Sequence, residues 1–108
     1  MENPPIKILY TVLGTFISKI EELPGRDIGE PDCALIDPCM WDFNHHAHAH
    51  DENGNHIESD DVPKFIVERF PAKIASPDRK LAILSSNIYT MAEPSQALLS
   101  EYLIAISD

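Results

Sequence analysis

Residues 24–61 of this chain carry no helical repeat of apolar side chains, and this central stretch restricts the folds that the chain can adopt. A loop of that length is uncommon in a compact domain, and where one occurs it usually has a function. The flanking sequences differ, because apolar residues recur in them at intervals of three and four. This spacing is typical of amphipathic helices. We therefore expect helices on both sides of an irregular insert.

Residues 4–23 have the clearest helical pattern. Their apolar positions form one stripe on a helix: Ile6, Leu9, Tyr10, Leu13, Phe16, Ile17, Ile20 and Leu23. A strand is the competing interpretation, since apolar residues also alternate at Ile6, Ile8, Tyr10, Val12 and Phe16. A strand would turn Leu9, Leu13 and Ile17 toward solvent. We therefore predict a helix over 4–23, although Gly14 inside it costs about 1 kcal/mol relative to alanine.

The C-terminal part, residues 62–107, is expected to complete the helical scaffold. Ser76-Pro77-Asp78 has the composition of a helix start and opens a predicted helix over 77–91. A further apolar stripe predicts a helix over 95–107. Residues 62–70 are assigned to a short helix, although their Phe-Ile-Val sequence suits a strand equally well. The expected fold is a single, mainly α domain, residues 1–108, with three to four helices and a long acidic, histidine-rich central loop or β-hairpin.

The formal net charge of −10 is concentrated in the centre of the chain. Ten of the 18 acidic residues lie in residues 27–63, where Lys and Arg are absent: Asp27, Glu30, Asp32, Asp37, Asp42, Asp51, Glu52, Glu58, Asp60 and Asp61. Net negative charge argues against nucleic acids and anionic membranes as partners. The sequence contains no apolar run long enough for a transmembrane helix and no recognisable signal peptide. We therefore expect a cytoplasmic protein.

The sequence offers no recognisable motif for nucleophilic catalysis. Cys33 and Cys39 are too few for a disulfide scaffold, and in a cytoplasmic protein we expect them to be free thiols. The acidic residues around them would raise the pKa of either thiol and weaken it as a nucleophile. The four glycines are isolated from one another, so no glycine-rich phosphate-binding loop is predicted. The sequence therefore assigns no catalytic residue, and it neither predicts nor excludes an enzymatic activity.

All five histidines lie within the sequence NHHAHAHDENGNH, residues 44–56. Asn53-Gly54 is a strong signal for a type I′ turn. A hairpin around this turn would place His46, His48 and His50 on one face of a strand. A helix would instead bring His46 and His50 together, because residues four apart are neighbours on a helix. Both arrangements supply two imidazoles to one metal ion.

The sequence therefore predicts a site for a divalent transition metal. Imidazole and carboxylate groups are ligands of Zn, Ni, Mn and non-haem Fe. The candidate ligands are the histidines and nearby acids of the insert: His46, His48, His50, His56, Glu52 and Asp42. The main functional hypothesis is a small metal-binding protein, in which an open coordination position would permit catalysis.

The alternative hypothesis is an acidic interaction or regulatory module that binds no metal. Its acidic centre would dock against a basic surface of a partner protein, and the association would weaken as the salt concentration rises. A homodimer is a further arrangement, in which the apolar face of residues 4–23 would pack against a second copy.

Overall fold

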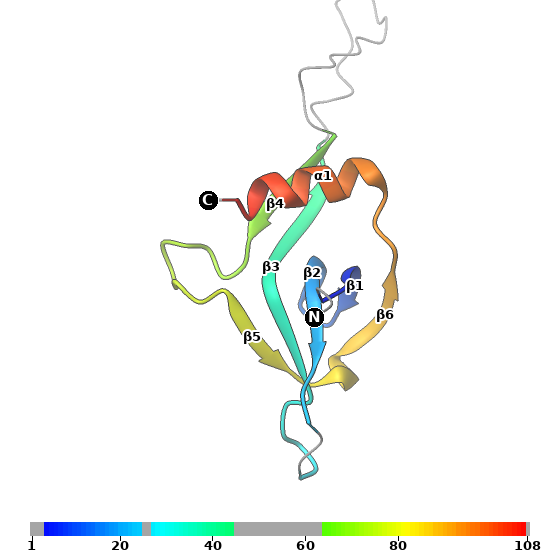
Figure 1. Ribbon diagram of the computed structural model, residues 1–108, viewed down its shortest axis with the longest axis vertical. Coiled ribbons are helices and arrows are strands. Elements are labelled where there is room, and N and C mark those ends of the chain that lie inside the picture. Colours follow the sequence, from blue (N-terminus) through cyan, green and yellow to red (C-terminus); the bar gives the residue numbers. More distant parts are fainter. Residues whose placement is uncertain (1–3, 25–26, 45–63, 108) are drawn as a thin grey trace, which may run out of the picture.

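The computed structural model describes residues 4–24, 27–44 and 64–107. In these ranges the chain forms six β-strands, a short 3₁₀ helix and one α-helix (Figure 1). The strands are β1 (Ile6–Thr11), β2 (Gly14–Glu22), β3 (Cys33–Phe43), β4 (Phe65–Arg69), β5 (Lys80–Ile83) and β6 (Ile88–Ala92). The 3₁₀ helix η2 (Ser85–Asn87) links β5 to β6, and helix α1 (Gln96–Ala105) follows β6. Neither helix of the described chain is long and apolar enough to cross a membrane.

All six strands belong to one antiparallel sheet, whose main path has the order β4-β3-β2-β1-β6. β3 is the longest strand, and two partners share its edge opposite β2. Its first half, Cys33–Ile36, pairs with β5, and its second half, Cys39–Phe43, pairs with β4. Asp37 lies between the two halves with a positive φ of 52°, at the point where the register between β2 and β3 shifts. This irregularity separates the two pairings of one long strand.

The predicted mainly α fold is wrong, because the described chain is dominated by antiparallel β-structure. Residues 4–23 form the β1–β2 hairpin, residues 62–70 contain β4, and residues 77–91 contain β5, η2 and all of β6 except Ala92. The predicted helix over 95–107 coincides with α1, where the Ser95 hydroxyl accepts a hydrogen bond from the backbone N–H of Leu98 at 3.2 Å. The central insert is not one continuous loop either, since β3 lies within it.

The β1–β2 hairpin replaces the predicted helix because both of its faces are buried. Paired residues on antiparallel strands share a face, so Ile8 and Ile17 lie on one face while Leu9 and Phe16 lie on the other. All four side chains are buried, and Leu9 and Ile17 have an exposed fraction of 0 %. The preference for a helix depended on Leu9, Leu13 and Ile17 being exposed in a strand, and of these three only Leu13 is exposed, with an exposed fraction of 69 %. Gly14 begins β2 with a φ of +136°, a conformation that other residues rarely adopt.

Two apolar clusters lie on opposite faces of the sheet. The helix-side cluster consists of Ile8, Ile17, Cys39, Leu98 and Tyr102. The inner cluster consists of Leu9, Phe16 and Leu35, and its partly buried neighbours are Ile20, Phe70, Ile83 and Ile88. Ile83 lies on β5 and Ile88 on β6, at opposite ends of the sheet (Figure 1). The sheet therefore curls around the inner cluster, and α1 covers the opposite face of the sheet.

Helix α1 is fastened to the sheet at Asp37. The hydroxyl of the fully buried Tyr102 donates to the backbone carbonyl of Asp37 at 2.9 Å. The Asp37 carboxylate accepts hydrogen bonds from Lys19 Nζ at 3.2 Å and from Arg79 Nε at 2.7 Å. Arg79 Nη2 also donates to the carbonyl of Ile106, at the C-terminal end of α1, at 2.7 Å. Burial raises the pKa of Tyr102 above its ordinary value, so its hydroxyl keeps the proton that it donates.

Candidate functional site

Five of the six predicted metal ligands lie outside the described residues: His46, His48, His50, His56 and Glu52. Asp42 is described, and it lies exposed on β3, opposite Ile66 of β4. Its Oδ1 accepts a hydrogen bond from the backbone N–H of Phe43 at 2.7 Å. Within residues 4–24, 27–44 and 64–107, no group of three or more His, Cys, Asp or Glu side chains could hold a metal ion.

The two segments that flank the histidine-rich stretch meet at one end of the sheet. Phe43 on β3 pairs with Phe65 on β4, and the backbone N–H of Asn44 donates to the carbonyl of Lys64 at 2.9 Å. Residues 44 and 64, which flank the histidine-rich stretch, therefore occupy neighbouring positions.

Aromatic side chains stabilise the base of this β3–β4 hairpin. The ring of Trp41 packs edge-on against Phe43 and Phe65, with centroid distances of 5.6 and 5.9 Å. Phe43 and Phe65 are themselves 5.6 Å apart. Such aromatic pairs contribute about 0.5–1.5 kcal/mol each beyond their buried area. The flanks of the histidine-rich stretch are thus held together by side chains as well as by backbone pairing.

The two cysteines are buried in the sheet and are free thiols. Cys39 belongs to the helix-side cluster, and Cys33 begins β3 with an exposed fraction of 4 %. Burial raises the pKa of the Cys39 thiol to about 11 and raises that of Cys33 as well. Both thiols therefore stay protonated near neutral pH, which makes them poor nucleophiles and poor metal ligands.

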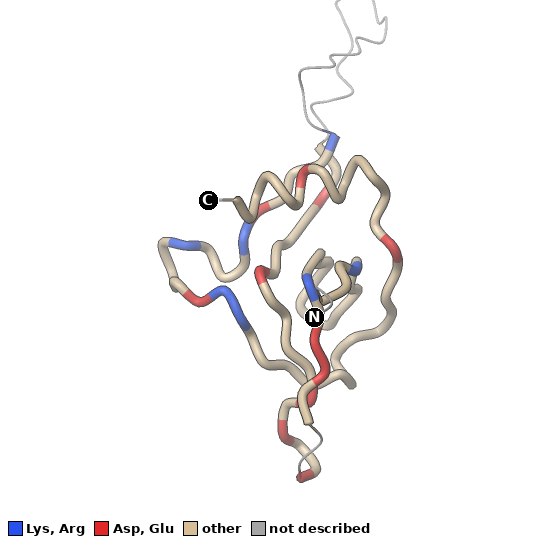
Figure 2. The backbone as a smooth tube through the Cα atoms, in the orientation of Figure 1, with Lys and Arg blue, Asp and Glu red and all other residues tan. Residues whose placement is uncertain are grey.

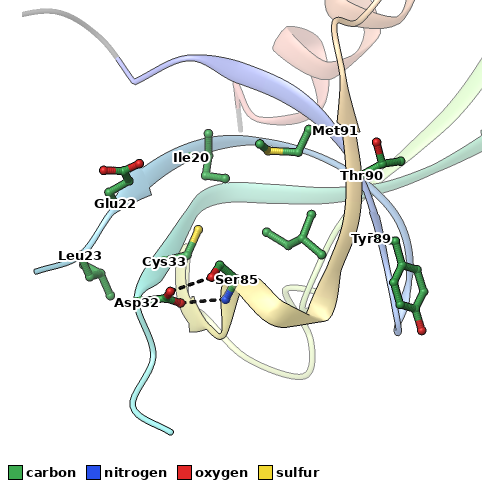
Figure 3. A pocket seen from close by; sticks show the side chains of 10 residues that line it. Ile20, Glu22, Leu23, Asp32, Cys33, Ser85, Tyr89, Thr90 and Met91 are labelled. Atoms are coloured by element: carbon green, nitrogen blue, oxygen red, sulfur yellow. Dashed lines mark hydrogen bonds between the residues drawn. The ribbon is translucent and has the colours of Figure 1, made fainter. Parts of the chain in front are cut away.

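An open groove of about 510 Å³ lies at the start of β3 (Figure 3), whereas β4 pairs with the other end of this strand. Its walls come from the end of β2, the start of β3, η2 and β6. The lining residues combine apolar, hydroxyl and acidic side chains: Ile20, Glu22, Leu23, Asp32, Cys33, Ser85, Ile88, Tyr89, Thr90 and Met91. Tyr89 and Met91 are exposed, with exposed fractions of 72 % and 51 %. The groove thus presents both hydrophobic surface and negative charge to solvent.

The polar end of the groove is built by Asp32 and Ser85. Asp32 Oδ1 accepts a hydrogen bond from the backbone N–H of Ser85 at 2.7 Å, and Oδ2 accepts one from the Ser85 hydroxyl at 2.6 Å (Figure 3). These two bonds lower the pKa of the Asp32 carboxyl, which is therefore ionised at neutral pH. A nucleophilic serine needs a general base that is oriented by a third group, and the groove lining contains no histidine. The pair fixes η2 beside β3 and holds one carboxylate at the groove.

The groove was not predicted from the sequence. Its residues come from four separate stretches, 20–23, 32–33, 85 and 88–91, which only the curled sheet brings together. Residues 88–91 were predicted to form the end of a helix, so a strand with an exposed edge was not expected there. One sequence signal did point to this region: the acidic run without Lys or Arg begins at Asp27 and includes Asp32.

Comparison with known proteins identifies a family for nearly the whole of the chain. No curated protein matches the sequence. The model of a family of unknown function, DUF6561, matches residues 5–107. That range includes every strand of the sheet and helix α1. The chain therefore belongs to the DUF6561 family.

Proposed function

We propose that this protein binds one divalent transition metal ion, Zn, Ni, Mn or Fe, through histidines of residues 45–63. The observation that supports this proposal most directly is the backbone pairing of Asn44 with Lys64, which brings the two ends of the candidate ligand stretch together. The stretch contains all five histidines of the chain and five of its acidic residues (Asp51, Glu52, Glu58, Asp60 and Asp61).

The pairing matters because ligands that are distant in the sequence must be gathered around one ion. Closing a flexible loop costs conformational entropy, and this cost rises with loop length. The β3–β4 hairpin closes the loop between residues 44 and 64 in the folded protein. Gathering His46 from one side and His56 from the other therefore costs less than it would in an open chain. Asp42 adds a solvent-exposed carboxylate at the base of the hairpin.

In the proposed site, His46 and His48 form the first ligand pair. His50, His56, Glu52 and Asp42 are the candidates that complete the coordination shell. Three protein ligands and a water molecule would give the metal an open position for hydrolytic chemistry, whereas four protein ligands would make the ion structural. The acidic surroundings favour a bound cation in both cases.

The proposal is tested by measuring the metal content of untagged protein that has been purified without chelators or metal-affinity resin. Inductively coupled plasma mass spectrometry should find about one equivalent of a single transition metal per chain, because the ligands are proposed to share one ion. The His46→Ala/His48→Ala double variant should lose it. His45→Ala is the matched control, since an alternating strand places His45 on the opposite face from His46 and His48.

Three results would count against the proposal. Wild-type protein could be metal-free and fail to bind any of the four metals tightly after reconstitution. The His45→Ala control could lose as much metal as the double variant, which would indicate nonspecific binding by imidazoles. Finally, a chelator could leave the melting temperature unchanged, whereas removing an ion that binds the folded state must lower it.

A further inference from the structure

Strand β6 ends the sheet and leaves one of its edges without a partner strand in the described chain. It pairs with β1 from Ile88 to Ala92 and with no other described strand. An unpaired edge presents backbone N–H and C=O groups that can accept another strand. Proteins commonly protect such edges with Lys, Pro or an inward-pointing charge. The sequence of β6, Ile-Tyr-Thr-Met-Ala, contains none of these.

The groove runs along this edge. Four consecutive residues of β6, 88–91, line it. Successive side chains of a strand point to opposite faces, so a cavity that lay over one face would be lined by alternate residues. Because β1 occupies the other edge, the groove lies along the unpaired one. Figure 3 shows β6 running beside the groove, with Met91 and Thr90 near one end and Ser85 near the other.

The groove carries negative charge that the described chain does not neutralise. Glu22 and Asp32 lie in its wall, and its lining includes no Lys, Arg or His. The ion pairs of the described residues involve the carboxylates of Glu93, Asp37 and Glu21, so neither groove carboxylate takes part in them. Figure 2 shows further acidic residues along the neighbouring β2–β3 connection, where Asp27 and Glu30 are exposed.

Apolar side chains supply the second part of the surface. Ile20 and Ile88 flank the inner cluster at the groove, and Met91 is half-exposed beside them. An extended segment that pairs with β6 would place alternate side chains over these residues. A basic residue at one end of the segment would then reach Asp32 and Glu22.

We infer that the free edge of β6 binds an extended, basic segment of a partner protein by strand addition, with its apolar side chains over Ile20, Ile88 and Met91. Charge decides between this occupant and a second copy of the chain. A second copy would bring another Glu22 and Asp32 and a net charge of −10, so that like charges would meet at the interface. A basic segment neutralises them. This inference does not depend on the metal proposal, because the groove contains none of the proposed ligands.

The test is a selection of peptides from a random display library of about ten residues, long enough to span a strand, against the full-length protein. Enriched peptides should alternate apolar residues and carry Lys or Arg toward one end. The affinity of a synthetic copy should fall on the order of tenfold in Glu22→Lys. Glu68→Lys is the matched control, since it makes the same charge change at an exposed carboxylate of β4 that lies outside the groove and forms none of the ion pairs above.

Two more comparisons separate strand addition from general attraction. Met91→Ser should weaken binding, whereas Met40→Ser, at another exposed methionine, should leave it unchanged. A strand forms hydrogen bonds to one neighbour through alternate residues. N-methylation of the peptide N–H groups that point toward β6 should therefore abolish binding, whereas N-methylation of the alternate N–H groups, which point away from β6, should have little effect.

The inference is overturned if the library yields no enrichment above an unrelated acidic protein, or if the enriched peptides lack basic residues. Equal weakening by Glu22→Lys and Glu68→Lys would overturn it as well, because the charge effect would then be nonlocal. A concentration-dependent dimer that Met91→Ser dissociates would identify the occupant as a second copy. Loss of peptide binding with intact metal content would leave the proposed metal function standing, so the two proposals fail separately.

Discussion

The hydrogen bonds of Tyr102 are predicted to contribute substantially to the stability of the fold. In Tyr102→Phe the ring keeps its place between α1 and the sheet, and only the hydroxyl is lost. That hydroxyl donates to the carbonyl of Asp37 at 2.9 Å and accepts a hydrogen bond from the backbone N–H of Lys19 at 3.3 Å. A buried polar group that loses its partner costs about 1–3 kcal/mol. The bond from Lys19 is long, so we expect a total loss of about 2 kcal/mol, most of it at the Asp37 carbonyl.

The loss is measurable by urea denaturation, detected through the fluorescence of Trp41, the single tryptophan. For a domain of this size the melting temperature should fall on the order of 10 °C. Tyr89→Phe is the matched control: Tyr89 has an exposed fraction of 72 %, so losing its hydroxyl should change stability by less than about 0.5 kcal/mol. If Tyr102→Phe is as stable as the control, the Tyr102 hydroxyl does not fasten α1 to β3, and this account of the helix attachment is wrong.

Three further predictions concern alkaline pH, the β1–β2 turn and the β3–β4 hairpin. Burial raises the pKa of Cys39 from 9.0 to about 11, so at alkaline pH the folded protein keeps a proton that the unfolded chain releases. The free energy of unfolding should therefore be steady below about pH 9 and fall as the pH rises toward 11. In Cys39→Ala it should fall less steeply over the same range. Gly14→Ala should lower the free energy of unfolding, measured by urea denaturation, by about 1–3 kcal/mol. Alanine is strained at a φ of +136°, and its Cβ would lie 3.0 Å from Met40 Cε. A variant as stable as the wild type would show that the turn adjusts freely. Replacing residues 45–63 by Asn-Gly should preserve the far-ultraviolet circular dichroism spectrum, since Asn44 and Lys64 are already paired and a two-residue turn can join them. The replacement should abolish metal binding, because it removes all five histidines. An unfolded product would mean that the replaced stretch is needed for the fold.

The error over residues 4–23 shows what an apolar pattern can and cannot specify. A strand that is buried on one face gives strict alternation, which the sequence alone distinguishes from a helix. β1 and β2 are buried on both faces, with Ile8 and Ile17 under α1 and Leu9 and Phe16 in the inner cluster. Apolar residues then occupy positions at intervals of two, three and four, and a helical stripe can be drawn through them. The segments that bury the second face of a strand lie far away in the chain, so the local sequence does not show that this face is buried.

At residues 76–78 the expected hydrogen bond of the Ser76 hydroxyl is present, but the helix that was predicted to follow it is not. The Ser76 hydroxyl does accept a hydrogen bond from the backbone N–H of Asp78 at 3.2 Å, as it would at a helix start. The chain then continues as β5, because Leu81 and Ile83 contribute to the apolar surface beside Phe16 and Leu35 and because β3 offers an open edge. A side-chain cap fixes one turn, and tertiary contacts decide whether a helix or a strand comes next in the chain.

The sequence by itself determined the concentration of acidic residues in 27–63, the histidine cluster and the presence of helix α1. These features depend on residue identity and on neighbours within a few positions. Only the tertiary structure decided the sheet order, the junction of Asp37 with Tyr102 and Arg79, and the groove beside β6. Each of these joins residues that are far apart in the sequence, because hydrogen-bonded strand pairing acts between segments whose partners no local pattern identifies.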